Sequence, residues 1–358
     1  MEKECKMKKF FFRKKVLITG HTGFKGSWLS LWMHHMGANV LGISNGNVSY
    51  PSNYEILKLK KKIKTKKIDI NNFKKVKSAI NSFNPNFIFH LAAEAIVQRS
   101  YKNPKKTWDT NSLGTINILE TLRNYNKNVT VVIITSDKVY KNLEISKGYK
   151  EEDSLGNIDP YSASKASADL ATQSYIKSFL IRNKNIKISI ARAGNVIGGG
   201  DWAVGRLIPD CIRSWSKNKI VVLRNPRSTR PWQHVLDVLN GYIKLAINLN
   251  KNKKINGEAF NFGPIIEKNN EVINVVKKMQ LFWSKARWKQ ETKKKFYESN
   301  LLHLNCSKAN KLLKWNCNLN LDKTIFFTIA WYKHFYKNPK DIYNFSIAQL
   351  NQFLQIKK

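Results

Sequence analysis

The sequence lacks long apolar runs. A membrane-spanning helix needs roughly 18 or more consecutive apolar residues, and no stretch of this chain comes near that length. The apolar piece Phe10–Phe12 near the start of the chain is also too short for the core of a signal peptide. We therefore expect a cytoplasmic protein with no membrane partner.

Cysteine is scarce as well, and its four copies are scattered at Cys5, Cys211, Cys306 and Cys317. Their spacing matches neither a CxxC pair nor the ligand set of a metal centre. The sequence therefore predicts neither a disulfide framework nor a metal site, and free thiols fit a reducing cytoplasm.

Acidic residues are few. The chain has 24 Asp and Glu against 63 Lys and Arg, which gives a net charge of +39. Such a charge can mark a protein that binds nucleic acid or another anionic polymer. The lysines are spread along the whole chain, however, without an arginine-rich tail. We expect no nucleic-acid partner, although a basic binding protein without turnover is a competing hypothesis; the positive field would also attract a phosphate-bearing substrate.

Short apolar strands alternate with helical segments through the first half of the chain. This alternation, with right-handed crossovers, predicts an α/β fold built on a Rossmann-type doubly wound parallel sheet. Ligands of such sheets bind beyond the carboxyl ends of the strands. The expected strands are 16–19, 39–43, one ending at 68–70, 87–90, 131–134 and 186–191, and the expected helices are 27–33, 71–83, 108–122 and 160–182.

A glycine-rich loop follows the first expected strand. Gly20, Gly23 and Gly26 stand at three-residue spacing between this strand and the next helix. Such glycines let the backbone turn tightly and approach a pyrophosphate at the N-terminus of the helix. Although the spacing is GxxGxxG rather than GxGxxG, its position between strand and helix predicts a dinucleotide site.

The end of the second expected strand carries no charge. Ser44-Asn45-Gly46-Asn47 offers no acid for an adenosine ribose and no Arg or Lys for a 2′-phosphate, which favours NAD over NADP. Ser44 or Asn45 could bond a ribose hydroxyl instead. Further on, Asp69 is a candidate contact to the adenine or, equally well, a cap for the helix 71–83.

Polar side chains of three kinds follow the buried strand 131–134, where Thr135-Ser136-Asp137-Lys138 delivers hydroxyls, a carboxylate and an amine. A second group comes on the helix that begins near Asp159-Pro160. Tyr161 and Lys165 stand at i and i+4 on this helix and share one face. A hydroxyl, a phenol and an ammonium brought together form a set that can move protons.

The chain changes character after Ala191. The segment 192–202 is glycine-rich, and 224–235 gathers three arginines with an aromatic residue. Arginines can bind phosphate oxygens and an aromatic ring can stack on a base, so we expect a nucleotide-linked substrate here. We expect a dinucleotide-binding domain at 1–191 and a smaller C-terminal nucleotide-sugar-binding domain at 192–358, with part of 232–264 packing back on the first.

Five motifs occur along the chain in a characteristic order, at 19–29, 135–138, 159–165, 192–202 and 230–235. Their sequences and order resemble the extended short-chain dehydrogenases/reductases. Within these enzymes they resemble the NAD-dependent epimerase/dehydratase group, which modifies nucleotide sugars. Within that group the motifs are similar to the CDP-glucose 4,6-dehydratases. The resemblance implies NAD as cofactor and CDP-glucose or a similar nucleotide sugar as partner. It implies cofactor contacts from Gly20, Thr22, Gly23, Phe24, Gly26, Asp69, Ile70, Leu91, Ala92, Ala93, Asn111, Tyr161 and Lys165, and substrate contacts from Asn195, Arg206, Arg230 and His234.

The implied reaction is oxidation at sugar C4, loss of water across C5 and C6, and return of the hydride to C6. Tyr161 would be the base at the C4 hydroxyl, with its pKa lowered by Lys165, and Ser136 would orient the same oxygen. Asp137 would be the acid for the C6 hydroxyl. Lys138 would be either the base at C5 or a charged stabiliser of the enolate.

The resemblance implies that the protein is a lyase. The alternative is another nucleotide-sugar 4,6-dehydratase or a 4-epimerase. The implied assembly is a homodimer or a homotetramer. Two features depart from the resemblance. Glu94 stands where the loop usually has Gln, which alters a polar contact near the site, and the overall charge is unusual.

Overall fold

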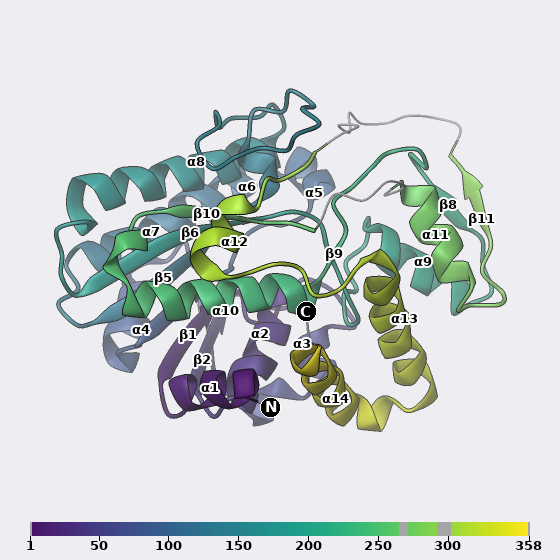
Figure 1. Ribbon diagram of the computed structural model, residues 1–358, viewed down its shortest axis with the longest axis horizontal. Coiled ribbons are helices and arrows are strands. Elements are labelled where there is room, and N and C mark those ends of the chain that lie inside the picture. Colours follow the sequence, from purple (N-terminus) through teal and green to yellow (C-terminus); the bar gives the residue numbers. More distant parts are fainter. Residues whose placement is uncertain (1, 265–270, 292–301, 357–358) are drawn as a thin grey trace.

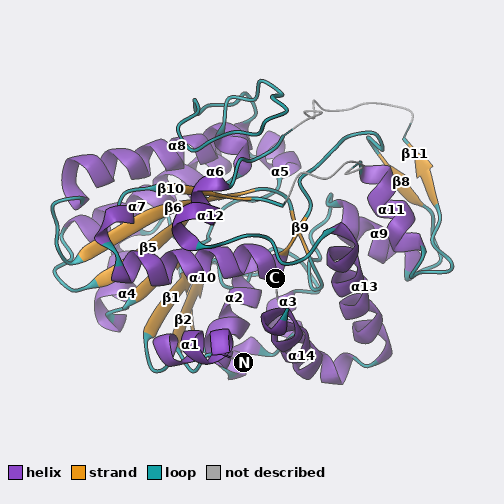
Figure 2. Cartoon of the chain, viewed as in Figure 1, coloured by secondary structure: helices purple, strands orange, loops and turns teal. Residues whose placement is uncertain are grey.

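The computed structural model describes residues 2–264, 271–291 and 302–356. Its centre is a seven-stranded sheet in the order β10-β6-β5-β4-β1-β2-β3, in which all neighbouring strands are parallel (Figure 2). The expected α/β fold with a doubly wound sheet is thus confirmed. The strands are β1 (Lys15–Thr19), β2 (Asn39–Ser44), β3 (Lys64–Lys67), β4 (Phe87–His90), β5 (Val129–Ile134), β6 (Ile186–Ala193) and β10 (Ala259–Phe262).

Helices cover both faces of the sheet (Figure 1). Because successive strand residues point to opposite faces, Val16 and Ile18 of β1 join the core beneath α2 and α10, whereas Leu17 joins the core beneath α4 and α7. The helices of this part are α1 (Glu2–Phe11), α2 (Phe24–His35), α3 (Asn53–Ile56), α4 (Phe73–Phe83), α5 (Val97–Lys102), α6 (Pro104–Trp108), α7 (Gly114–Arg123), α8 (Pro160–Tyr175) and α10 (Val235–Lys251).

Several boundaries differ from the sequence expectation. The third strand lies earlier than 68–70, in the basic run at Lys64–Lys67. Lysines are tolerated there because the strand is at the edge of the sheet, where their side chains reach solvent. The apolar residues that suggested a strand, Ile68 and Ile70, are buried in the loop that follows. The expected helix 108–122 contains a π-helical turn at Asp109–Leu113. The expected helix 160–182 changes to a π-helical turn at Ile176–Leu180.

A smaller region built from the second half of the chain lies beyond the carboxyl ends of the strands (Figure 1). In it β8 (Val221–Leu223) pairs with β11 (Trp288–Gln290), and β7 (Val196–Ile197) pairs with β9 (Gln233–His234). Its helices are α9 (Leu207–Trp215), α11 (Val272–Gln280), α13 (Leu321–Lys337) and α14 (Ile342–Gln355), whereas α12 (Ser307–Leu313) packs on β10 of the main sheet and on α10 (Figure 1). Between these pieces the chain returns to the main sheet, where β10 pairs with β6 and α10 packs on β5.

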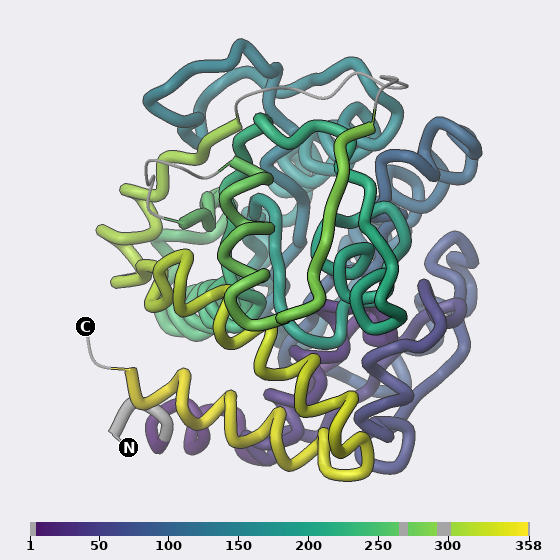
Figure 3. Tube along the Cα trace, turned by 90° about the vertical axis from the view of Figure 1, so that its right-hand side faces the viewer, coloured from purple at the N-terminus to yellow at the C-terminus, as the bar shows by residue number. Residues whose placement is uncertain are grey.

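The last two helices form a hairpin that reaches back to the N-terminal part, and both termini lie on the same side of the molecule (Figure 3). The hairpin packs on α2. The ring centroids of Trp32 and Phe353 are 6.0 Å apart, and His35 Nε2 forms a hydrogen bond of 3.1 Å with Asn351 Oδ1. Within the described ranges, no helix combines the length and the apolar character needed to cross a membrane.

Candidate active site

A cavity of about 700 Å³ opens at the carboxyl ends of β1, β2, β4, β5 and β6 and extends to the smaller region. This is the edge at which the sequence placed its candidate residues. The predicted residues that line the cavity are Gly20, Thr22, Gly23, Phe24, Gly26, Asp69, Ile70, Leu91, Ala92, Ala93, Ser136, Asp137, Lys138, Tyr161, Asn195, Arg206 and Arg230.

Three predicted residues lie outside this lining. Lys165 is buried just behind it, and Asn111 is buried with its side-chain oxygen accepting a hydrogen bond from the Glu94 backbone N–H at 2.8 Å. His234 is buried as well, and its Nδ1 accepts a hydrogen bond from the Leu236 N–H at 3.3 Å, so it caps α10. His234 therefore meets backbone rather than the cavity.

The glycine loop is closed so tightly at Gly20 and Gly26 that neither position admits a side chain. A Cβ on Gly26 would lie 2.1 Å from the Gly20 carbonyl oxygen, and a Cβ on Gly20 would lie 2.8 Å from the Ala92 backbone. Gly23 caps α2 without any side-chain hydrogen bond. The first N–H groups of α2 are thus left to face the cavity, an arrangement that suits a pyrophosphate.

The end of β2 is organised by hydrogen bonds between polar side chains. The Thr22 hydroxyl lies 3.1 Å from Ser44 Oγ and donates to the Gly46 carbonyl at 2.6 Å. Asn45 donates to Asp69 Oδ2 at 3.2 Å. Asp69 lines the cavity and accepts a hydrogen bond from the Asn71 N–H in the loop before α4. The expectation that Asp69 caps this helix is wrong, because the cap is Asn72, whose side chain accepts from the Lys75 N–H at 3.0 Å.

Ser136, Asp137 and Lys138 lie in and beside a 3₁₀ turn at Asp137–Val139 that follows β5. The Ser136 hydroxyl donates to Asp137 Oδ1 at 2.9 Å and accepts from the Lys138 N–H at 3.2 Å. Burial raises the pKa of Asp137, against the lowering effect of the Lys138 charge. Because the charged form is disfavoured by burial, Asp137 is suited to hold a proton.

Tyr161 and Lys165 come from the first turns of α8, which begins where the Asp159 side chain accepts a hydrogen bond from the Ser162 N–H. Burial raises the pKa of Tyr161 to about 12, whereas its hydrogen bond with Ser136 and the charge of Arg206 act to lower it. Lys165 Nζ donates to the Ile134 carbonyl at 2.9 Å. Burial lowers the pKa of Lys165 to about 7.

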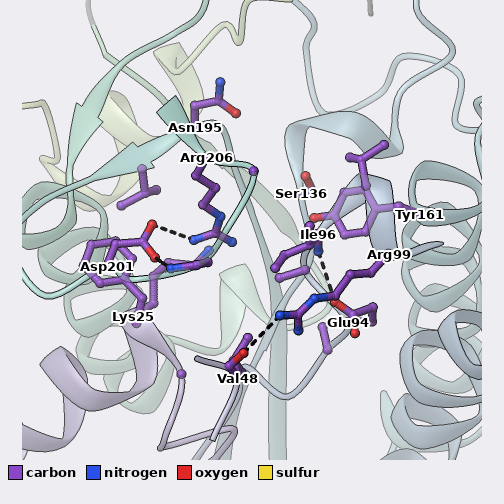
Figure 4. Close-up of a pocket in the computed structure, with 18 of the residues that line it drawn as sticks. Lys25, Val48, Glu94, Ile96, Arg99, Ser136, Tyr161, Asn195, Asp201 and Arg206 are labelled. Atoms are coloured by element: carbon purple, nitrogen blue, oxygen red, sulfur yellow. Dashed lines mark hydrogen bonds and ion pairs between the residues drawn. The ribbon is translucent and has the colours of Figure 1, made fainter. Parts of the chain in front are cut away.

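Arg206 faces Tyr161 and Ser136 from the opposite side of the cavity (Figure 4). Its guanidinium donates to Asp201 Oδ2 at 2.9 Å, and the Asp201 charge raises the Arg206 pKa. Glu94, the departure noted in the sequence, lies on the same side as Tyr161, with its Oε1 accepting from the Ile96 N–H at 3.3 Å. The cavity therefore has charged groups on both walls.

Sequence reasoning missed Lys25. It lies in the first turn of α2 and lines the cavity, and its Nζ lies 3.5 Å from the Tyr242 hydroxyl. Burial and the charge of Arg206 lower the pKa of Lys25 to about 8, while Asp137 raises it. The signal was present, because Lys25 stands inside the glycine motif, at a position next to Gly26.

Comparison with known proteins places this geometry in a family. A family model described as GDP-mannose 4,6 dehydratase matches residues 17–326. The chain is 42% identical over 331 residues to a CDP-glucose 4,6-dehydratase of Salmonella typhimurium, covering 91% of this chain and 92% of that one. It is 30% identical to a dTDP-D-glucose 4,6-dehydratase of Dictyostelium discoideum, over 75% of this chain and 62% of that one.

Solved structures share the fold. A dTDP-glucose 4,6-dehydratase from Bacillus anthracis, in complex with NAD, superposes with a TM-score of 0.76 at 23% identity, covering 93% of this chain and 99% of that one. The epimerase Mth375 from Methanothermobacter thermautotrophicus superposes with a TM-score of 0.81 at 23% identity, covering 94% and 97%. Since the family model spans most of the sequence, the chain belongs to the GDP-mannose 4,6 dehydratase family.

Proposed function

We propose that the protein converts CDP-glucose to CDP-4-keto-6-deoxyglucose in an NAD-dependent 4,6-dehydration. The observation that carries the proposal is the meeting of Ser136, Asp137 and Tyr161 in one cavity, which also contains the glycine loop. The relative from Salmonella typhimurium, which covers nearly the whole chain, supports the choice of CDP-glucose.

NAD would lie along the carboxyl end of the sheet. The pyrophosphate would fit beside the glycine loop, whose backbone excludes a Cβ at Gly20 and at Gly26, and at the N-terminus of α2, which has no side-chain cap. Lys165 would reach the nicotinamide ribose from behind Tyr161. When bound, NAD supplies the hydride acceptor for C4 and the hydride donor for C6.

In the first step Tyr161 takes the proton of the C4 hydroxyl. Its pKa of about 12 makes the phenolate costly in the free site. The Arg206 charge would have to stabilise that form while the substrate is bound, together with the Ser136 hydroxyl once its proton turns from Asp137 Oδ1 to the phenolate. Ser136 also holds the C4 oxygen in line with the base.

In the second step Asp137 gives its proton to the departing C6 hydroxyl. Burial keeps this carboxyl protonated at higher pH than an exposed aspartate, which suits a general acid. Lys138 faces the same cavity, either as the base that removes the C5 proton or as the charge that stabilises the enolate.

The test is to incubate the purified protein with NAD and a panel of CDP-, dTDP-, UDP- and GDP-glucose and to identify the products by mass spectrometry and NMR. We expect a 4-keto-6-deoxy product from CDP-glucose. A product with the C6 hydroxyl intact and C4 inverted would instead establish a 4-epimerase, and turnover of only a different nucleotide sugar would overturn the choice of substrate.

We further propose a homodimer or homotetramer in the cytoplasm. Large apolar side chains are exposed on the helical layer that carries α6 and α8, with Trp108 at 40%, Leu113 at 53% and Leu170 at 52% of full exposure. Burial of these side chains between two copies would stabilise an assembly. Analytical ultracentrifugation over a range of concentrations tests it, and a monomer at all concentrations would contradict it.

A further inference from the structure

One face of α8 is locked to the end of β5 by two consecutive contacts. Tyr161, Lys165 and Asp169 stand at four-residue intervals and so share this face. Lys165 Nζ donates to the Ile134 carbonyl at 2.9 Å, and the Thr135 hydroxyl donates to Asp169 Oδ2 at 3.0 Å. Because Ile134 and Thr135 are neighbours in the chain, the two bonds fix the helix along the strand.

Asp169 is held in turn by Arg192 of the adjacent strand β6. The guanidinium Nε donates to Oδ2 at 2.9 Å and Nη2 donates to Oδ1 at 2.8 Å, so the pair is bidentate. Their side chains are only 1% and 0% exposed. A buried pair of this kind adds little net stability over apolar packing, because both charges lose their hydration. What the pair does provide is a fixed position of α8 relative to β6.

The same guanidinium also reaches the other end of the turn that follows β5. Arg192 Nη1 donates to the Tyr140 hydroxyl at 2.9 Å and to the Glu151 carbonyl at 2.8 Å. The Tyr140 hydroxyl donates onward to Asn261 Oδ1 at 2.7 Å. Thr135 and Tyr140 flank residues 136–139, so the ion pair holds this segment from both sides.

We infer that the buried Asp169–Arg192 pair is the positioning device of the candidate active site. It fixes the turn that presents Ser136, Asp137 and Lys138 and sets this turn in register with the helix that presents Tyr161 and Lys165. Neither residue lines the cavity, so both act through the groups that they hold. The inference deepens the proposed function and rests on it for the roles of the positioned residues.

Asp169 has an electrostatic effect as well. Burial and the charge of Lys25 lower the pKa of Lys165, and the Asp169 carboxylate acts in the opposite direction. Without this carboxylate, Lys165 would lose its proton at lower pH. The charged groups that act on Lys165 are Lys25 on α2 and Asp169 on α8. Asp137, after β5, acts on Lys25, and His90 on β4 is neutral, because burial lowers its pKa to about 3.

Two variants separate the geometric part from the electrostatic part. Thr135→Val removes one hydrogen bond and leaves the ion pair intact, whereas Asp169→Asn removes the charge. Leu249→Ala, a buried change on α10 far from the cavity, serves as a control for loss of stability alone. Each protein is compared with wild type by hydrogen–deuterium exchange of the segment 135–140, which requires no substrate, and by single-turnover reduction of bound NAD with CDP-glucose across pH.

Each variant is measured at the same interval below its own melting temperature. Under these conditions we expect the amides of 135–140 to exchange about tenfold faster in T135V and in D169N than in L249A. We expect both to reduce NAD at least about tenfold more slowly at unchanged substrate affinity, as misplaced groups do. D169N alone should move the alkaline decline of the rate to lower pH. Exchange and rates equal to those of L249A would overturn the inference.

Failure of the proposed function gives a different result. If wild type leaves NAD oxidised with CDP-glucose, the proposed reaction is wrong, while the exchange of 135–140 still decides whether the pair positions the turn.

Discussion

The Ser136 hydroxyl donates to one carboxyl oxygen of Asp137, and the other oxygen, Oδ2, is buried without a hydrogen-bond partner among the described residues. A buried carboxylate in this position would leave one oxygen unsolvated, which costs free energy. A proton on Oδ2 removes the buried charge, which is the larger cost, and gives the group a donor to offer to a substrate oxygen. The contact therefore favours Asp137 as an acid rather than as a base.

Replacing this acid should separate the oxidation from the loss of water. Asp137→Asn keeps the shape of the side chain but has no acidic proton, so we expect the turnover rate to fall by about 10²–10⁴-fold. Oxidation at C4 should continue, and reduced nicotinamide should accumulate on the enzyme, as followed by its near-ultraviolet absorbance. Equal losses of both steps would contradict an acid role limited to the C6 hydroxyl.

Lys25 should tune that acid. Its positive charge lowers the pKa of Asp137, so Lys25→Met should let this pKa rise further. Asp137 would then stay protonated to higher pH, and the pH above which the dehydration rate declines should move upward. Lys25→Arg retains the charge and serves as the control. Superimposable pH–rate profiles for wild type and K25M would show that the two groups are not coupled.

Tyr161 should be required for the first step. Tyr161→Phe removes the phenol oxygen that takes the C4 proton, so reduction of bound NAD by CDP-glucose should slow by about 10²–10⁴-fold. Affinity for NAD, measured by quenching of tryptophan fluorescence, should fall far less than the rate, because the glycine loop is untouched. Rapid NAD reduction by Y161F would remove Tyr161 from the proposed mechanism.

The glycine loop offers a test of cofactor binding that is independent of the sugar. Gly26→Ala would place a Cβ 2.1 Å from the Gly20 carbonyl oxygen, a contact with backbone that cannot be relieved by rotating a side chain. We expect NAD affinity to fall by at least about tenfold, because the loop must open to admit the methyl group. Gly263→Ala is the matched control and should bind NAD normally, because its added Cβ would meet only side chains, the nearest being Leu304 at 3.3 Å, and Gly263 does not line the cavity.

Much of the site could be predicted because its signals are local. An apolar run followed at once by polar residues located Ser136 and Asp137, and Asp159-Pro160 marked the start of the helix that carries Tyr161. Residues at the carboxyl ends of parallel strands meet at one edge of the sheet whatever the loops between them do.

The remainder depended on the exact start of a helix and on contacts between residues far apart in the sequence. Lys25 was passed over because the helix was expected to begin at Ser27, whereas α2 begins at Phe24 and places Lys25 in its first turn. Asp169 and Arg192 are separated by 23 residues and meet only when β6 lies beside β5. His234 was expected to bind substrate, but its ring is used to cap α10.

The lysines of β3 have a consequence for the behaviour of the protein at high concentration. This strand is an edge strand of the main sheet, and its Lys64, Lys66 and Lys67 side chains are exposed there. The unpaired backbone groups of an edge strand can pair with a strand of another molecule and so start aggregation. A row of like charges opposes that pairing by repulsion. Salt weakens the repulsion, since charges are screened over about 10 Å at 0.1 M. The molecule is thus protected against aggregation by its own charge, and that protection is strongest in dilute buffer.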